Sequence, residues 1–225
     1  MSITTTKLTR WAGLSAAVAG LLFIGVQINH PQLDAGFATT AEYTVRQTLK
    51  ALMAGLALVG ITGMYLRQVT QAGVLGLVGY LIFGAGYLIM FSVEVIGAVV
   101  LPTIARTTPG YVNDVFAMIM GDPVGGDIGL MTVLNLASAA TFLGGGLVFG
   151  IALFRARVLA RWAAALLAAG SVATVFVPLL PQVNDRLFAV PIGAALIGLG
   201  YSLWSGQRTA AAASNSAAAV RVEAS

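Results

Sequence analysis

Six stretches of the chain are apolar over about the 20 residues that an α-helix needs to cross the hydrocarbon core of a membrane. The stretches lie at residues 11–29, 48–66, 73–101, 128–154, 159–180 and 186–204. This pattern is typical of an integral membrane protein with several transmembrane helices. The sequence therefore predicts an all-α, polytopic fold in which residues 1–208 form one six-helix transmembrane domain.

Composition narrows the chemistry that is available to this chain. Of its 225 residues, 58% are hydrophobic and 9% are charged, there is no cysteine, and His30 is the single histidine. Cysteine and histidine sites for zinc, haem or iron–sulfur clusters are therefore excluded, and we predict no metal and no cofactor. The formal net charge is +4, but the basic residues are scattered at helix ends, so no nucleic-acid partner is predicted.

The charged residues indicate how the chain is oriented. Eight basic residues fall on one side of the predicted helices: Lys7, Arg10, Arg67, Arg155, Arg157, Arg161, Arg208 and Arg221. Four fall on the other side: Arg46, Lys50, Arg106 and Arg186. Because cytoplasmic loops carry the excess of lysine and arginine, both termini are predicted to be cytoplasmic, in a multi-pass protein of the bacterial inner (cytoplasmic) membrane. The opposite, outer side carries the acids Asp34, Glu42, Asp114, Asp122, Asp127 and Asp185.

An internal repeat organises the six segments. The sequence "RWAGLSAAVAG" from Arg10 recurs as "RWAAALLAAG" from Arg161, and "QAGVLGLVGYLIFGAG" from Gln71 is a looser copy. The chain is therefore predicted to form three tandem helical hairpins. The first segment is then a retained helix rather than a cleaved signal peptide, since it is the copy of the fifth.

Glu94 is the most informative single residue, because it is the only carboxylate within the long apolar segment 73–101. An ionisable group at membrane depth is costly and indicates a functional site by default. Counted from Gly73 at about 1.5 Å per residue, Glu94 lies about 30 Å along its helix, in the outer leaflet. Lys50 and Asn135 reach a similar depth on neighbouring helices, which predicts a polar layer there.

Helical phase predicts which side chains share this layer. Tyr80, Tyr87 and Glu94 recur every seven residues and so lie on one stripe of the third segment. The predicted ligand-binding residues are Tyr80, Tyr87, Phe91, Glu94, Arg46, Lys50, Asn135, Asp185 and Arg186. Glu94 is predicted to face the bundle interior with Lys50 or Arg46 as its partner, and whether it is charged or protonated is left open.

Two flanking regions complete the prediction. Residues 108–123 have Thr108 as a candidate N-cap, Pro109 in the first turn and apolar residues at helical spacing, so a surface helix over the outer mouth of the bundle is predicted. Residues 209–225, "TAAAASNSAAAVRVEAS", lack a core-forming pattern and are predicted to be a disordered cytoplasmic tail.

Several motifs together resemble a known group of proteins. They are "RWAGLSAAVAGLLF" near the N-terminus, "HP" after the first segment, "GLVGYLIF" in the third, and "LVFGIALFRARVLARWAAALLAAG" across the fourth and fifth. Over residues 9–205 the chain is similar to an uncharacterised family of small six-helix integral membrane proteins common in high-GC bacteria of the actinobacterial type. The resemblance implies the six-helix fold and implies no activity.

Three functions from different classes fit these features. The first is binding or handling of a lipid- or isoprenoid-like molecule in an outer-leaflet polar pocket around Glu94, with membrane lipids as the surroundings. The second is a membrane-bound enzyme such as an isoprenoid (terpene) cyclase, in which Glu94 is the catalytic general acid and Tyr80, Tyr87 and Phe91 shield a cation. The third is a structural or accessory subunit without a ligand. The sequence decides neither between these classes nor the oligomeric state.

Overall fold

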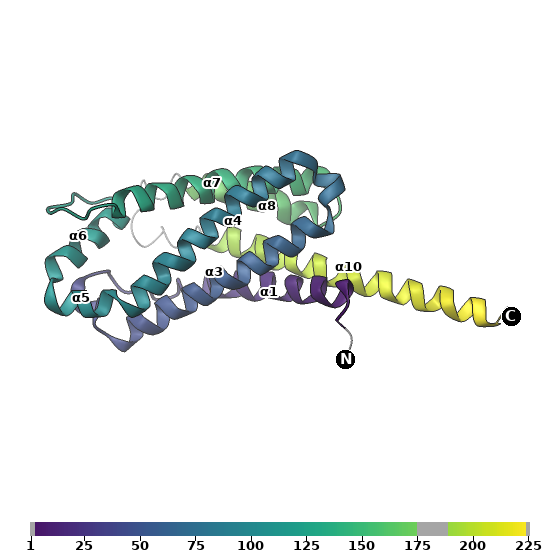
Figure 1. Ribbon diagram of the computed structural model, residues 1–225, viewed down its shortest axis with the longest axis horizontal. Coiled ribbons are helices and arrows are strands. Elements are labelled where there is room, and N and C mark those ends of the chain that lie inside the picture. The colour runs from purple at the N-terminus through teal and green to yellow at the C-terminus, as the bar shows by residue number, and fades with distance from the viewer. Residues whose placement is uncertain (1–2, 175–188, 224–225) are drawn as a thin grey trace.

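The computed structural model describes residues 3–174 and 189–223, with side chains as far as Gly206 in the last helix. All of the regular structure in these ranges is helical (Figure 1), which confirms the predicted all-α class. The predicted site residues Asp185 and Arg186 lie outside the described residues.

Five of the described helices are long and apolar enough to cross a membrane, as expected of a multi-pass membrane protein. They are α1 (Thr5–Gly25), α3 (Ala41–Arg67), α4 (Val69–Val99), α7 (Met131–Ala156) and the first part, Ala189–Gly206, of α10 (Ala189–Glu223). The predicted fifth span, 159–180, is represented by the apolar helix α8 (Arg161–Ala173), which is 13 residues long where it is described. A sixth span therefore stays a prediction.

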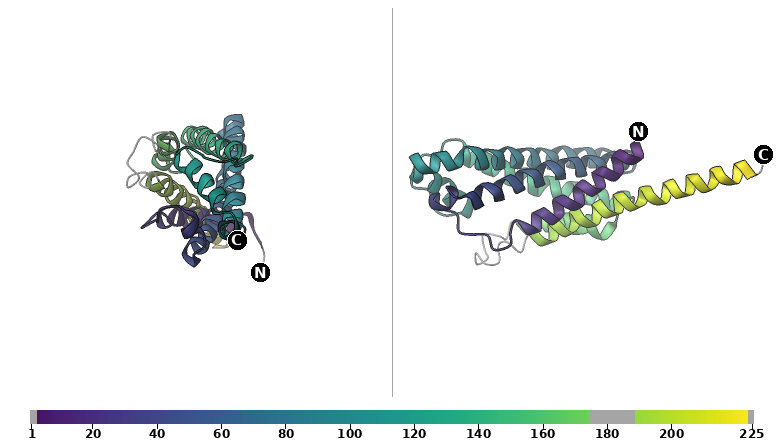
Figure 2. Two further views of the ribbon diagram at one scale, coloured as in Figure 1. Left: turned by 90° about the vertical axis from the view of Figure 1, so that its left-hand side faces the viewer. Right: turned by 90° about the horizontal axis from the view of Figure 1, so that it is seen from below.

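The long helices are arranged as a ring in chain order (Figures 1 and 2). α1 packs against α3, α3 against α4, α4 against α7, α7 against α8 and α8 against α10. The extensive contact of α10 with α1 closes the ring. Each predicted hairpin pair is in contact, but α3 with α4 and α10 with α1 are in contact too, so the grouping into three hairpins stays a prediction.

Close helix crossings in this ring depend on glycine. Gly13 on α1 faces Gly200 on α10, and a Cβ at Gly13 would lie only 2.7 Å from the carbonyl oxygen of Gly200. Gly20 and Gly193 repeat this arrangement two turns along the same pair of helices. Without a hydrophobic driving force between helices in lipid, such close backbone approach supplies the packing attraction that holds them together. Large buried side chains such as Phe83, Phe149 and Leu196 fill the interior.

The two ends of the ring differ, and we name them by their contents. The loop end carries the short helices α2 (Ala35–Ala38), α5 (Leu101–Thr107) and α6 (Pro109–Met120). The basic end carries the start of α1 and the turns between α3 and α4 and between α7 and α8 (Figure 1). Among the residues that the structure describes, the two basic groups that the sequence separates thus belong to opposite ends of the ring. That the basic end is cytoplasmic stays a prediction.

The surface helix predicted within residues 108–123 is present as α6. It begins at Pro109, ends at Gly121 in a left-handed conformation with φ of 80°, and buries Val112, Val115 and Phe116. Thr108 occupies the predicted N-cap position, but its side chain makes no capping hydrogen bond. α6, α2 and α5 share a small second core with the start of α3, so the loop end is covered by a packed cap.

The C-terminal residues differ from the prediction of a disordered tail at 209–225. In the structure α10 continues as a helix to Glu223 and extends away from the other helices (Figure 2). The physical reason is composition, because the stretch is rich in alanine, which has the highest intrinsic helix propensity.

Candidate functional site

Glu94 lies near the loop end of α4 and faces α3, as its helical phase predicts. Its partners are on the opposite side of the α3–α4 contact: Gln47 is its side-chain hydrogen-bond partner, and the charge of Lys50 acts on it. The carboxylate oxygen Oε2 is fully buried. Lys50 is thus the basic partner of Glu94 at this contact, one of the two that the sequence predicted.

Lys50 links the carboxylate to the loop that follows α1. Its Nζ donates to Oε1 of Gln47 at 3.0 Å and lies 3.3 Å from Nε2 of His30. Nδ1 of His30 lies 2.9 Å from the carbonyl oxygen of Pro31. Because a carbonyl oxygen only accepts, Nδ1 carries the ring proton and Nε2 accepts from Lys50. The single histidine of the chain is therefore a neutral acceptor in this cluster.

Tyr43 adds an aromatic wall on the side of the cap. It lies one helical turn before Gln47, is fully buried, and its ring packs edge-on against Phe37 at 5.5 Å and Phe116 at 6.0 Å between ring centroids. Glu94 is close enough that its charge acts on Tyr43 as well. We call Glu94, Tyr43, Gln47, Lys50 and His30 the polar cluster.

Gly97 makes room for the polar cluster on α4. A Cβ at this position would lie 2.6 Å from Nε2 of Gln47 and 3.4 Å from the hydroxyl oxygen of Tyr43. Gln47, Tyr43 and Gly97 were not among the residues predicted from the sequence. A signal for two of them exists, because Tyr43, Gln47 and Lys50 follow each other at i, i+4 and i+7 and so share one face of α3.

Two polar atoms of the cluster are buried without a hydrogen-bond partner among the described residues. They are Oε2 of Glu94 and the hydroxyl oxygen of Tyr43. Buried polar groups nearly always have a partner, and leaving one unpaired costs about 1–3 kcal/mol. The arrangement can therefore take a hydrogen-bond donor at Glu94 together with a donor or acceptor at Tyr43.

Arg46 has a different role from the one predicted. Its guanidinium donates to the backbone carbonyls of Val26, Ile28 and Asn29 at 3.1–3.2 Å, and its Nε donates to Glu42 at 2.9 Å. The reason is its direction on α3, because it points toward the C-terminal end of α1, where helix carbonyls lack partners. Arg46 therefore caps α1 and is not the partner of Glu94.

The aromatic residues predicted beside Glu94 belong to other contacts. Tyr80 stacks on Tyr65 at 4.8 Å between ring centroids, and its hydroxyl group lies 3.2 Å from Oγ1 of Thr62. Tyr87 is buried edge-on against Phe83 and Phe142. The structure thus places both tyrosines in the helix core along α4, outside the polar cluster.

Phe91 and Asn135 are surface residues. Phe91, one turn before Glu94, is 38% exposed and lies over Gly55 of α3. Asn135 is exposed on α7, because the first buried residue of that helix is Phe142 and the turns before it are uncovered. The predicted polar layer therefore includes α3 and α4 but not α7.

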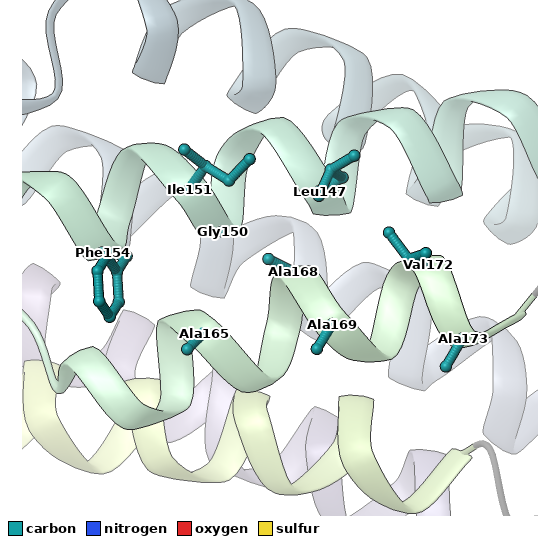
Figure 3. A pocket seen from close by; sticks show the side chains of 9 residues that line it. All are labelled: Leu147, Gly150, Ile151, Phe154, Ala165, Ala168, Ala169, Val172 and Ala173. Atoms are coloured by element: carbon teal, nitrogen blue, oxygen red, sulfur yellow. The ribbon is translucent and has the colours of Figure 1, made fainter.

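Two apolar grooves lie away from the polar cluster. One, of about 920 Å³, runs between α1 and α3 at the loop end and includes the exposed Glu42 and the half-buried Arg46. The other, of about 560 Å³, runs between α7 and α8 (Figure 3). Within the described residues, no group of three histidine, cysteine, aspartate or glutamate side chains could hold a metal ion.

Comparison with known proteins adds no relative to this picture: no family model, curated protein or solved structure matches the chain. The resemblance to a family of six-helix bacterial membrane proteins stays a prediction.

Proposed function

We propose that the protein binds a lipophilic, lipid- or isoprenoid-like molecule through a polar end group that donates a hydrogen bond, such as a hydroxyl group. The observation that carries this proposal is the pair of buried, unpartnered oxygens on Glu94 and Tyr43. A hydroxyl group placed between them would donate to Oε2 of Glu94 and accept from the Tyr43 hydroxyl group, which satisfies both atoms at once.

The surroundings of Glu94 suit a ligand with an apolar tail. Phe91 and Val95, its neighbours along α4, are each 38% exposed on a helix that is apolar enough to span the membrane. A polar end group held at Glu94 would therefore leave its tail along the lipid-facing side of α4. On the assumption that the basic end is cytoplasmic, this site lies in the outer leaflet of the cell membrane.

The remaining members of the polar cluster would prepare the carboxylate for this task. Gln47 and Lys50 interact with Glu94 from the α3 side, so the carboxylate is oriented from that side while its oxygen Oε2 has no hydrogen-bond partner. Tyr43 is held by Phe37 and Phe116, and Phe116 belongs to the cap helix α6. A ligand that binds Tyr43 would thereby stabilise the cap.

The cyclase alternative receives no support from the aromatic side chains. It needs Tyr80, Tyr87 and Phe91 around a substrate beside Glu94, whereas Tyr80 is stacked on Tyr65 and Tyr87 is enclosed by phenylalanines. The structural alternative uses the same contacts among Glu94, Gln47 and Lys50 as the binding proposal. A variant that stays folded distinguishes the binding proposal from the structural alternative: it loses the co-purified lipid if the protein binds one at this cluster, and its lipid content is unchanged if the cluster is only structural.

The test is to identify by mass spectrometry the lipophilic material that co-purifies with the detergent-solubilised protein. Wild type is compared with Glu94→Gln and Tyr43→Phe, and Glu42→Gln serves as the matched control, because Glu42 is an exposed acid on the same end of α3. We expect a defined hydroxyl-bearing lipid in wild type and in the control, and its loss in the other two. Equal lipid content in all four proteins would refute the proposal.

A further inference from the structure

The groove between α7 and α8 has an entirely apolar lining. Its walls come from Leu147, Gly150, Ile151 and Phe154 on α7 and from Ala165, Ala168, Ala169, Val172 and Ala173 on α8 (Figure 3). The groove exists because α8 presents alanines where larger side chains would fill the space. Along α8 it extends over the nine residues from Ala165 to Ala173. The eight steps between them, at 1.5 Å each, span about 12 Å, which is most of one leaflet's roughly 15 Å of hydrocarbon.

One end of the groove is marked by positive charge. Phe154 lines the end nearest to the turn into α8 (Figure 3), and the guanidinium carbon of Arg161 lies 4.2 Å from the centroid of its ring. Arg155 and Arg157 precede Arg161 at the same turn, and all three side chains are exposed. Arg157 ends α7 in a left-handed conformation with φ of 59°.

No acid opposes these arginines among the side chains that the structure describes. The described acidic side chains lie at the loop end, in the cap and its loops or near that end of α3 and α4. The basic end of the groove therefore combines exposed positive charge with an adjoining apolar channel. Arginine clusters next to a membrane attract anionic headgroups, and an apolar groove between helices takes an acyl chain.

We infer that this groove binds an anionic phospholipid of the leaflet at the basic end, with one acyl chain along Ala165, Ala169 and Leu147 and the phosphate at Arg155, Arg157 and Arg161. The inference is independent of the polar cluster, because the two sites lie at opposite ends of the ring. It identifies the occupant by charge: a zwitterionic lipid would gain less from the three arginines, because its headgroup amine offsets the charge of its phosphate.

The test measures lipid binding to the purified full-length protein by native mass spectrometry, with detergent micelles that contain dioleoylphosphatidylglycerol or dioleoylphosphatidylcholine. Arg155→Gln combined with Arg157→Gln removes two of the three headgroup contacts and keeps Arg161 on Phe154. Arg67→Gln is the matched control, since Arg67 is an exposed arginine of the basic end that ends α3 rather than lining the groove. Ala169→Leu fills the groove, and Ala85→Leu on the exposed side of α4 controls for it.

We expect phosphatidylglycerol to bind more tightly than phosphatidylcholine, and the double arginine variant to weaken it about thirtyfold, or about fivefold for each arginine. Ala169→Leu should abolish binding of both lipids, and the two controls should bind as wild type does. Melting temperatures of the lipid-free variants identify any that fail to fold. Equal affinity for the two lipids, binding unaffected by Ala169→Leu, or a dimer that Ala169→Leu dissociates would each overturn the inference.

Discussion

Gly97 on α4 lies directly opposite Gln47 on α3, so close that a Cβ at position 97 would be 2.6 Å from the amide nitrogen of Gln47. This contact lets a polar side chain of α3 reach Glu94 on α4. In a membrane, a side-chain amide that approaches a neighbouring helix this closely contributes both packing and a hydrogen bond. The polar cluster therefore requires a glycine at position 97, because any side chain there would collide with Gln47.

The first prediction concerns this glycine. Gly97→Ala should force Gln47 away from Glu94 and lower the stability by about 1 kcal/mol, the net worth of one hydrogen bond. Gly145→Ala should cost more, because its Cβ would meet the rigid backbone of Phe83 rather than a mobile side chain. Gly84→Ala, with no neighbour within 4 Å, is the control and should be neutral or stabilising. Thermal melts in detergent measure the order; a Gly97→Ala variant as stable as Gly84→Ala would contradict it.

The second prediction concerns the coupling of Glu94 with Lys50. Removing one partner of a buried charged pair leaves the other without compensation and costs about 3–5 kcal/mol. Lys50→Met should therefore destabilise the protein strongly, and adding Glu94→Gln should restore part of the loss. The double-mutant cycle is expected to give a coupling free energy of about 1–3 kcal/mol. Additive effects of the two substitutions would show that the charges do not interact.

The third prediction concerns Arg46 as the cap of α1. Arg46→Met removes the donors to three carbonyl groups and should lower stability by about 2 kcal/mol, with faster hydrogen exchange at the end of α1. Arg46→Lys should recover only part of this, because a lysine cannot serve several acceptors in the same plane. Glu42→Gln is the control: Glu42 is 55% exposed, so loss of its ion pair should cost less than about 1 kcal/mol.

The fourth prediction concerns the cap. α6 buries only three side chains, those of Val112, Val115 and Phe116, and it starts at Pro109 and is followed by Gly121, so its amides should exchange earlier than those of α3. A lipid bound at Tyr43 should slow this exchange through the contact of Tyr43 with Phe116. Hydrogen-exchange mass spectrometry with and without the co-purified lipid checks both statements. Exchange in α6 as slow as in α3, and unchanged by lipid, would make the cap a fixed cover.

The fifth prediction concerns orientation. The excess of basic residues at the end that holds both termini predicts that this end is cytoplasmic. A C-terminal tag should resist protease added to intact cells and be cleaved in inverted membrane vesicles. Cleavage in intact cells would reverse the orientation and place Glu94 in the cytoplasmic leaflet, while leaving the geometry of the polar cluster unchanged.

Much of the architecture follows from the sequence. Long apolar segments near the required length can form little except membrane helices, so the all-α class and most helix positions were predictable. Helical phase also placed Glu94 toward the interior, because it lies within a regular helix whose period is known. Counting residues along the helices put Lys50 at a similar depth and left Lys50 and Arg46 as alternative partners. The direction in which a side chain points from its own helix can be predicted without knowing the neighbouring helices.

Contacts between two helices do not follow from the sequence in this way, because they depend on how one helix is rotated and displaced relative to the other. Nothing in the period of α3 says that Gln47 and Tyr43 meet Gly97, and nothing in the spacing of Arg46 says that its acceptors are backbone carbonyls of α1. Backbone acceptors carry no sequence signature at all. The neighbours of Tyr80 and Tyr87 could not be predicted either. Both tyrosines share the stripe of Glu94, but Tyr80 packs against Tyr65 and Tyr87 against Phe142. These partners are decided by the close glycine crossings of the ring, which set the distance and angle of each helix pair.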